Sequence, residues 1–137
     1  FADFDNDGDQ DVFEQMGGNY PGDRCHDALY QNPGFGNHWI TVKLIGVESN
    51  RAGVGARIRV DVIEDGRPRT IYKHVNSGGS FGANPLRQMI GLGKATRIER
   101  VEILWPATRR TQSSTEVPLD QAIEIVEGQG RVALKEL

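Results

Sequence analysis

Five aspartates occupy alternate positions near the start of the chain, in the segment FADFDNDGDQDVFEQ. Carboxylates this close raise one another's pKa and repel unless a cation compensates them. Ca2+ takes roughly six to eight oxygen ligands, which short acidic side chains on a curled backbone supply. Gly8 follows the third aspartate and allows the sharp turn that such a loop needs. The spacing therefore predicts a calcium loop whose ligands are the side chains of Asp3, Asp5, Asp7 and Asp11 and the carbonyl of Asp9.

A solvated acidic segment is the simplest alternative, but such segments lack the regularly placed apolar residues seen here at Phe4, Val12 and Phe13. The spacing from Asp3 to Glu14 also fits an EF-hand loop. An EF-hand needs a helix leaving the loop, and the glycines and proline of QMGGNYPGD disfavour one. We therefore expect a loop between two β-strands, with DVFEQM as the outgoing strand.

Length and charge narrow the class of protein. The 137 residues suit one ordinary domain, with or without an added fragment. The net charge is −3, and residues 1–14 alone hold six acids and no base. The mixed charge of the remainder argues against a nucleic-acid-binding surface. No apolar run approaches the roughly 18 residues that predict a membrane span.

Alternating apolar and polar residues predict successive β-strands from residue 38 onward, and Asp65-Gly66 predicts a tight hairpin turn. We predict an all-β fold with an antiparallel β-sandwich over residues 38–127. A first unit at residues 1–33 precedes it, and a tail at residues 128–137 follows it, either as an added strand or loose. The predicted core of the sandwich contains Ile40, Val42, Leu44, Ile58, Val60, Val62, Val101, Ile103, Ile123 and Ile125.

Other residue types that could do chemistry are few. Gly53 and Gly55 are followed by a strand pattern and not by a helix, which favours a tight turn over a phosphate loop. His38 and His74 lie in predicted strands without a paired Asp or Cys spacing. The single cysteine, Cys25, cannot form a disulfide within the chain, and we expect a partly buried thiol or one paired with an upstream segment. We therefore expect no enzymatic activity.

Two parts of the chain resemble known families. The pattern F-x-D-x-D-x-D-G-x-x-D is similar to the calcium loop of FG-GAP/VCBS repeats, the blades of integrin-like β-propellers. The segments NHWITVKLIGVESNRAGVGARIRV, SGGSFGANPLRQMIGLGKATRIERVEILWP and VPLDQAIEIVEG resemble the ASPIC/UnbV domain of the cartilage acidic protein-like family. After WP the chain departs from that family's pattern with ATRRTQSS.

The resemblance implies an architecture and a location. Residues 1–33 would be the end of a propeller blade, incomplete and poorly stable alone, because a blade needs about four strands. The chain would be the C-terminal part of a longer secreted protein, extracellular or periplasmic. We expect a non-catalytic calcium-binding module for cell adhesion, matrix or protein–protein interaction, with an unknown extracellular protein or glycan as partner. The alternative is an accessory, glycan-binding domain of a secreted enzyme, with Trp39, Tyr72 and Phe81 as candidate aromatics.

Overall fold

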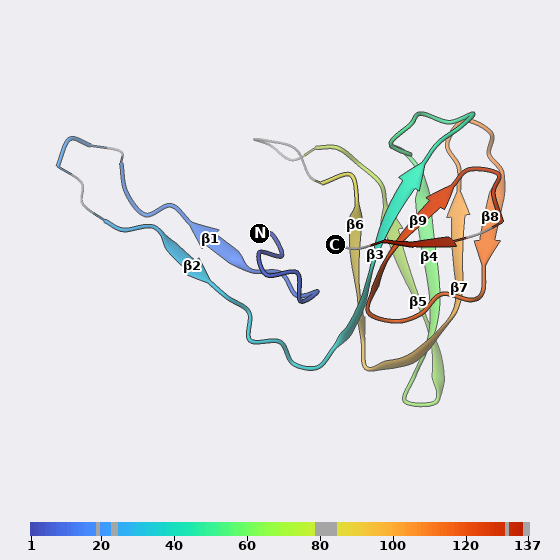
Figure 1. The fold of residues 1–137 in the computed structure, drawn as a ribbon, viewed down its shortest axis with the longest axis horizontal. Coiled ribbons are helices and arrows are strands. Elements are labelled where there is room, and N and C mark those ends of the chain that lie inside the picture. Colours follow the sequence, from blue (N-terminus) through green and yellow to red (C-terminus); the bar gives the residue numbers. More distant parts are fainter. Residues whose placement is uncertain (19, 23–24, 79–84, 131, 136–137) are drawn as a thin grey trace. The chain divides into compact units, whose positions relative to one another are not determined.

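The computed structural model describes residues 1–18, 20–22, 25–78, 85–130 and 132–135. It divides into two compact units, Phe1–Gly36 and Asn37–Leu137. The described residues form strands and no helix, which confirms the all-β class (Figure 1). The strands are β1 (Val12–Glu14), β2 (Ala28–Tyr30), β3 (His38–Ile45), β4 (Arg57–Glu64), β5 (Arg67–His74), β6 (Gln88–Gly93), β7 (Ala95–Leu104), β8 (Thr111–Ser114), β9 (Gln121–Val126) and β10 (Val132–Lys135).

The second unit is a β-sandwich of two four-stranded sheets. One sheet has the order β10-β9-β3-β6 and the other β5-β4-β7-β8. The paired strands are antiparallel with one exception: β3 and β9 run parallel, with Ile40 opposite Gln121 and Ile45 opposite Val126. The first sheet is therefore mixed. The chain forms β4 to β8 before β9 pairs with β3. The tail adds β10 to the edge of β9.

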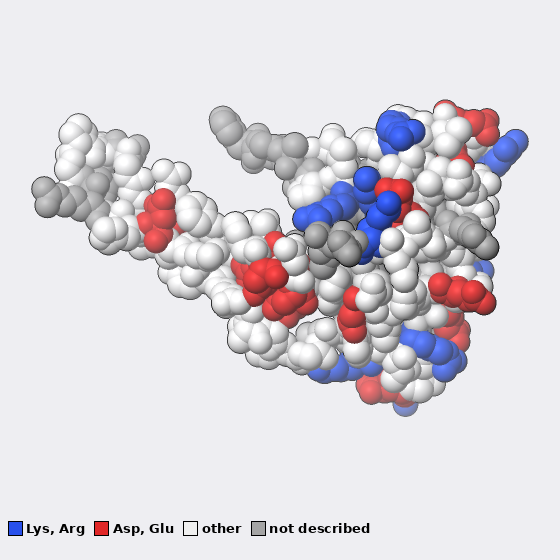
Figure 2. Space-filling view, in the orientation of Figure 1, with Lys and Arg blue, Asp and Glu red and all other residues white. Residues whose placement is uncertain are grey.

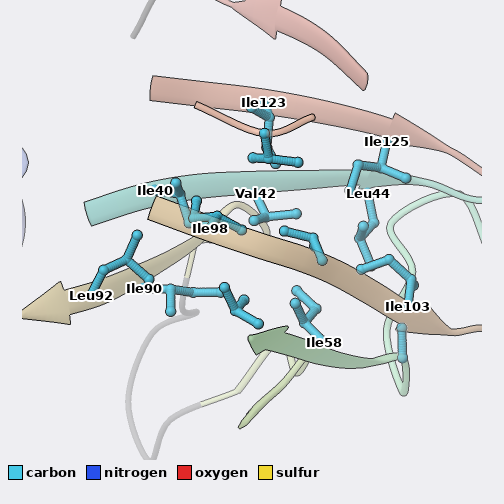
Figure 3. Packing of buried hydrophobic residues seen from close by; sticks show 14 of the residues in the cluster. Ile40, Val42, Leu44, Ile58, Ile90, Leu92, Ile98, Ile103, Ile123 and Ile125 are labelled. Atoms are coloured by element: carbon cyan, nitrogen blue, oxygen red, sulfur yellow. The ribbon is translucent and has the colours of Figure 1, made fainter. Parts of the chain in front are cut away.

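Alternation along the strands fills the space between the sheets with apolar side chains. All ten predicted core residues are buried, and Trp105, Leu92 and Val75 join them. One hydrophobic cluster contains residues of both sheets, and in Figure 3 Ile123 and Ile40 lie across from Ile58 and Ile103. Burial of apolar surface contributes about 25 cal/mol per Å2, so this cluster is the main stabilising element of the second unit.

The turn between β4 and β5 confirms the hairpin prediction. Asp65 has a φ of 51° and Gly66 a φ of 72°. Positive φ at both central residues is the backbone of a type I′ turn, whose twist matches that of the flanking strands. The hairpin sets the register from Arg57 opposite His74 to Glu64 opposite Arg67.

The first unit has a different basis for its structure. Strands β1 and β2 pair antiparallel, and Ala2 forms an isolated bridge with Asp11. Among the described residues of Phe1–Gly36, only Gly8 and Asp11 are buried. Phe13 and Leu29 are about half exposed, so these strands cover no apolar core. Polar contacts must therefore hold this unit together.

The described residues include no helix that is long and apolar enough to cross a membrane.

Shortening Ile58 tests the packing of the sandwich. Ile58 is fully buried, so Ile58→Ala is expected to lower the free energy of unfolding by about 2–5 kcal/mol and Ile58→Val by about 0.5–1.5 kcal/mol. Val47 is 65% exposed, and Val47→Ala is the matched control, with an expected change within about 0.5 kcal/mol. Urea unfolding measures all three. Equal effects of Ile58→Ala and Val47→Ala would contradict the assigned core.

Candidate metal centre

Three of the predicted ligands converge in the first unit. One carboxylate oxygen each from Asp3, Asp5 and Asp11 lies within 4.8 Å of the others. Two oxygens that bind Ca2+ from opposite sides, at about 2.3–2.6 Å each, are separated by about 5 Å. The spacing of the three carboxylates therefore fits a shared Ca2+ ion, and carboxylate oxygen is the ligand type that this ion prefers.

The backbone curl that brings these residues together is made by residues 3–9. Asn6 and Gly8 adopt the left-handed conformation, with φ of 59° and 94°. The Asp3 carboxylate accepts hydrogen bonds from the N–H groups of Asp7 and Gly8, both at 3.1 Å. The curl therefore depends on the side chain of a candidate ligand.

Asp11 anchors the loop to the rest of the first unit. Its side chain is only 1% exposed, and it accepts backbone N–H groups of Phe4 and Asn32, both at 2.8 Å. These two hydrogen bonds lower the pKa of Asp11 more strongly than burial raises it. Asp11 is therefore an ionised carboxylate inside the unit.

The remaining predicted ligands lie outside this trio. Asp7 accepts the N–H of Asp9 at 2.9 Å and stabilises the turn. The Asp9 carboxylate lies beside Gly34, 3.0 Å from the position that a Cβ would take there. Acidic side chains crowd together in this unit in Figure 2, and none of the ion pairs between described residues includes Asp3 or Asp5.

A second segment, which the sequence pattern did not predict, lines the cluster. The Gln31 amide donates to Asp5, and Asn32 donates its backbone N–H to Asp11. Asn32 also caps the following turn by accepting the N–H of Gly34 at 3.2 Å. The only available signal was two polar amides directly before Pro33, which is too common to identify a site.

A second buried carboxylate, Glu127, lies in the sandwich. It accepts the backbone N–H groups of Val47, Glu48 and Ser49 at 2.8, 2.9 and 2.7 Å and the Ser49 hydroxyl at 2.8 Å. The Thr108 hydroxyl also donates to it, at 3.2 Å. Burial raises the pKa of Glu127, but the hydrogen bonds outweigh it and lower this pKa to about 2. Five hydrogen bonds thus hold the carboxylate, and its role is to fix two loops.

A histidine–aspartate pair joins the starts of the two parallel strands. His38 Nδ1 lies 2.7 Å from Asp120 Oδ2, so the expectation that His38 has no paired Asp is wrong. Asp120 also accepts the N–H of Trp39 at 3.1 Å and donates its own N–H to the Trp39 carbonyl at 2.8 Å. A separation of 82 residues hid this pair from any spacing argument. The contacts fix the register of β3 against β9.

The candidate aromatics do not form a row. Trp39 belongs to the outer face of the β10-β9-β3-β6 sheet, because Ile40 and Val42 point into the core. Tyr72 is 63% exposed on the other sheet and lies opposite Arg59, which points away from the core because its neighbours Ile58 and Val60 point into it. The two rings therefore project from opposite faces of the sandwich. Phe81 lies outside the described residues.

Cys25 is exposed, and the partly buried thiol that we expected is not found there.

The chain thus combines an acidic loop unit with a β-sandwich in which a buried acid fixes two loops. The family model described as ASPIC and UnbV matches residues 46–132, and the chain belongs to this family. The matched range runs from the loop held by Glu127 to the first residue of β10. A search of curated proteins gave no match. The family match does not include the acidic loop, so its similarity to FG-GAP/VCBS repeats remains a prediction.

Replacing Glu127 by Gln tests the buried carboxylate. We expect Glu127→Gln to lower the free energy of unfolding at pH 7 by about 1–3 kcal/mol, because hydrogen bonds to a charged acceptor are lost. The folded pKa is about 2 against an ordinary 4.5, so the stabilisation is complete above the ordinary value and is lost as the pH falls through the folded value. The difference between wild type and variant, measured by urea unfolding, should therefore shrink from pH 4.5 towards pH 2.

The exposed Glu116 provides the control for this prediction. Glu116→Gln should change stability by less than about 0.5 kcal/mol at any pH in the same range. A difference between wild type and Glu127→Gln that stays constant with pH would contradict the assigned role of the carboxylate.

Proposed function

We propose that this chain is a non-catalytic, calcium-binding module of an extracellular protein, serving adhesion or assembly with a protein or glycan partner. The observation that carries the proposal is the convergence of Asp3, Asp5 and Asp11, with Asp11 buried and ionised. Three carboxylates held together repel one another, and a bound cation would remove that repulsion.

The loop residues would have distinct roles around the ion. Asp11, fixed by Phe4 and Asn32, would supply a rigid oxygen from the interior. Asp5 is exposed and would supply a movable one after exchanging its contact with Gln31. The bound ion supplies positive charge that offsets the carboxylates. Because the first unit has little buried apolar surface, such binding would contribute a large share of its stability by mass action.

An extracellular location suits an exposed site of this kind. Calcium sites of extracellular modules bind with Kd values of roughly 10^-4 to 10^-3 M. Exposed ligands such as Asp5 favour that weak range over the tight binding of intracellular buffers. The secreted location, and the FG-GAP/VCBS character of the first unit, are parts of the same proposal.

Two further acids of the sandwich serve structural roles, which supports a role in binding and not in catalysis. Glu127 holds loops, as described above, and Asp61 accepts hydrogen bonds from Thr70, Arg59 and Arg100 on the outer face of β4. Each of these carboxylates is occupied by partners within the sandwich. Neither is positioned as an open acid or base.

Calcium titration of the protein tests the proposal. We expect Ca2+ to raise the melting temperature and to bind with a Kd on the order of 0.1–1 mM, more tightly than Mg2+, which demands a smaller octahedral site. Asp5→Asn should weaken Ca2+ binding at least about tenfold, because it removes one charged ligand. The substitution leaves the backbone hydrogen bonds of the loop in place, because Asp3, Asp7 and Asp11 accept them. Isothermal titration calorimetry measures both.

Glu14→Gln is the matched control, because Glu14 would be a ligand only in an EF-hand arrangement. We expect this variant to bind Ca2+ like the wild type. Calcium affinity that survives Asp5→Asn, or that falls equally in Glu14→Gln, would overturn the proposed ligand set.

The partner is tested separately, by incubating the labelled protein with arrays of matrix proteins and glycans in Ca2+ and in EGTA. Calcium-dependent retention supports the interaction role. Equal retention in Ca2+ and in EGTA would mean that binding of the partner does not depend on the metal site.

A further inference from the structure

The outer face of the β10-β9-β3-β6 sheet carries a cleft that the proposed function does not use. The cleft has a volume of about 450 Å3, within the roughly 300–1,000 Å3 typical of small-molecule sites. It lies over the middle of β3 and β9 and is lined by Thr41, Lys43, Leu86, Arg87, Ala122, Ile123 and Lys135. These residues come from four separate segments of the second unit.

Thr41 is the unusual residue of this cleft. Its neighbours Ile40 and Val42 point into the core, so the Thr41 side chain is on the outer face, where polar residues normally contact water. It is nevertheless only 3% exposed, and its hydroxyl oxygen has no hydrogen-bond partner among the described residues. Leaving a buried hydroxyl unpaired destabilises the fold, and an acceptor atom of a ligand would remove that penalty.

The charges around the cleft are predominantly positive. Lys43 and Lys135 share one acid, Glu124, at 3.1 and 3.8 Å. Arg87 is exposed and takes part in none of the ion pairs between described residues. Three cations therefore face a single carboxylate, and Figure 2 shows Lys and Arg side chains gathered over this sheet around an acidic group. The surplus charge favours an anion.

The wall and floor of the cleft are apolar. Leu86 is 46% exposed beside Arg87, and Ala122 lies opposite Thr41 in the sheet. A small inorganic anion would satisfy the cations but would leave this apolar surface in water. A ligand with both an anionic group and an apolar body would cover the whole cleft.

We propose that this cleft binds an organic anion, whose carboxylate or sulfate group contacts Arg87, Lys43 and the Thr41 hydroxyl while its body lies on Leu86 and Ala122. An aliphatic carboxylate and a sulfated sugar share this chemistry. The site consists only of residues of the sandwich, so the proposal does not depend on calcium binding by the acidic loop.

Titrations followed by 1H–15N NMR of the whole chain test the site with three probes: sodium octanoate, a sulfated disaccharide and inorganic sulfate. We expect one of the two organic probes to give saturable shifts at the amides of Thr41, Lys43 and Ala122, and inorganic sulfate to bind more weakly. The stronger organic probe identifies the source of the anion. Binding should also weaken as ionic strength rises, because exposed charges are screened.

Variants separate recognition from folding. Arg87→Gln should weaken binding of the better probe by about threefold to tenfold, whereas Arg57→Gln, the same change on the other sheet, should leave it unaltered. Thr41→Val should weaken binding and raise the melting temperature of the unliganded protein, because it removes an unpaired buried hydroxyl at nearly constant volume. If Thr41 had only a structural role, Thr41→Val would raise the melting temperature without weakening binding of the probe.

Three results would overturn the proposal. The first is an absence of saturable shifts with either organic probe at millimolar concentration. The second is equal weakening by Arg87→Gln and Arg57→Gln, which would indicate general charge attraction. The third is binding of inorganic sulfate as tight as that of both organic probes, which would remove the role of the apolar floor.

Discussion

The buried carboxylate of Glu127 is the interaction on which one end of the sandwich depends. It follows β9 directly, and its own N–H donates to the Ile45 carbonyl at 2.9 Å, which continues the parallel pairing of β3 with β9. Its side chain then binds three successive N–H groups of the loop after β3 and the Thr108 hydroxyl beyond β7. One residue thus joins both sheets, and a buried charge is tolerable only because so many donors surround it.

A buried carboxylate that accepts backbone N–H groups also holds the first unit, with a different consequence. Asp11 is buried and accepts two distant N–H groups, where Glu127 accepts three, but Asp11 has no apolar cluster around it. The sandwich keeps its shape because apolar burial and the carboxylate act together. The acidic loop has only the polar network, and two further carboxylates lie beside Asp11. The cation that we propose would therefore contribute more to the stability of that arrangement than to the stability of the sandwich.

The sequence allowed the strands and the core to be predicted because both follow from local alternation. Ile58, Val60 and Val62 repeat every second residue, and that period alone determines which face they cover. The parallel pairing of β3 with β9 was not predictable, because it brings together segments about 80 residues apart through contacts such as His38 with Asp120. In the acidic loop, the aspartates could be named from their spacing, whereas Gln31 and Asn32 reach them from a segment with no periodic signal.

Thr41 shows what such a failure of local reasoning can reveal. Alternation assigns it correctly to the outer face of β3, and that rule predicts contact with water. It is nevertheless buried, and the cleft beside it is lined by elements that are not adjacent in sequence: Leu86 and Arg87 before β6, and Lys135 at the end of β10. These elements build a wall on a face that would otherwise be flat, and they leave a hydroxyl without a partner inside it. Valine at this position would remove the unpaired hydroxyl, whereas the ligand that we propose would give that hydroxyl the partner that the sheet does not supply.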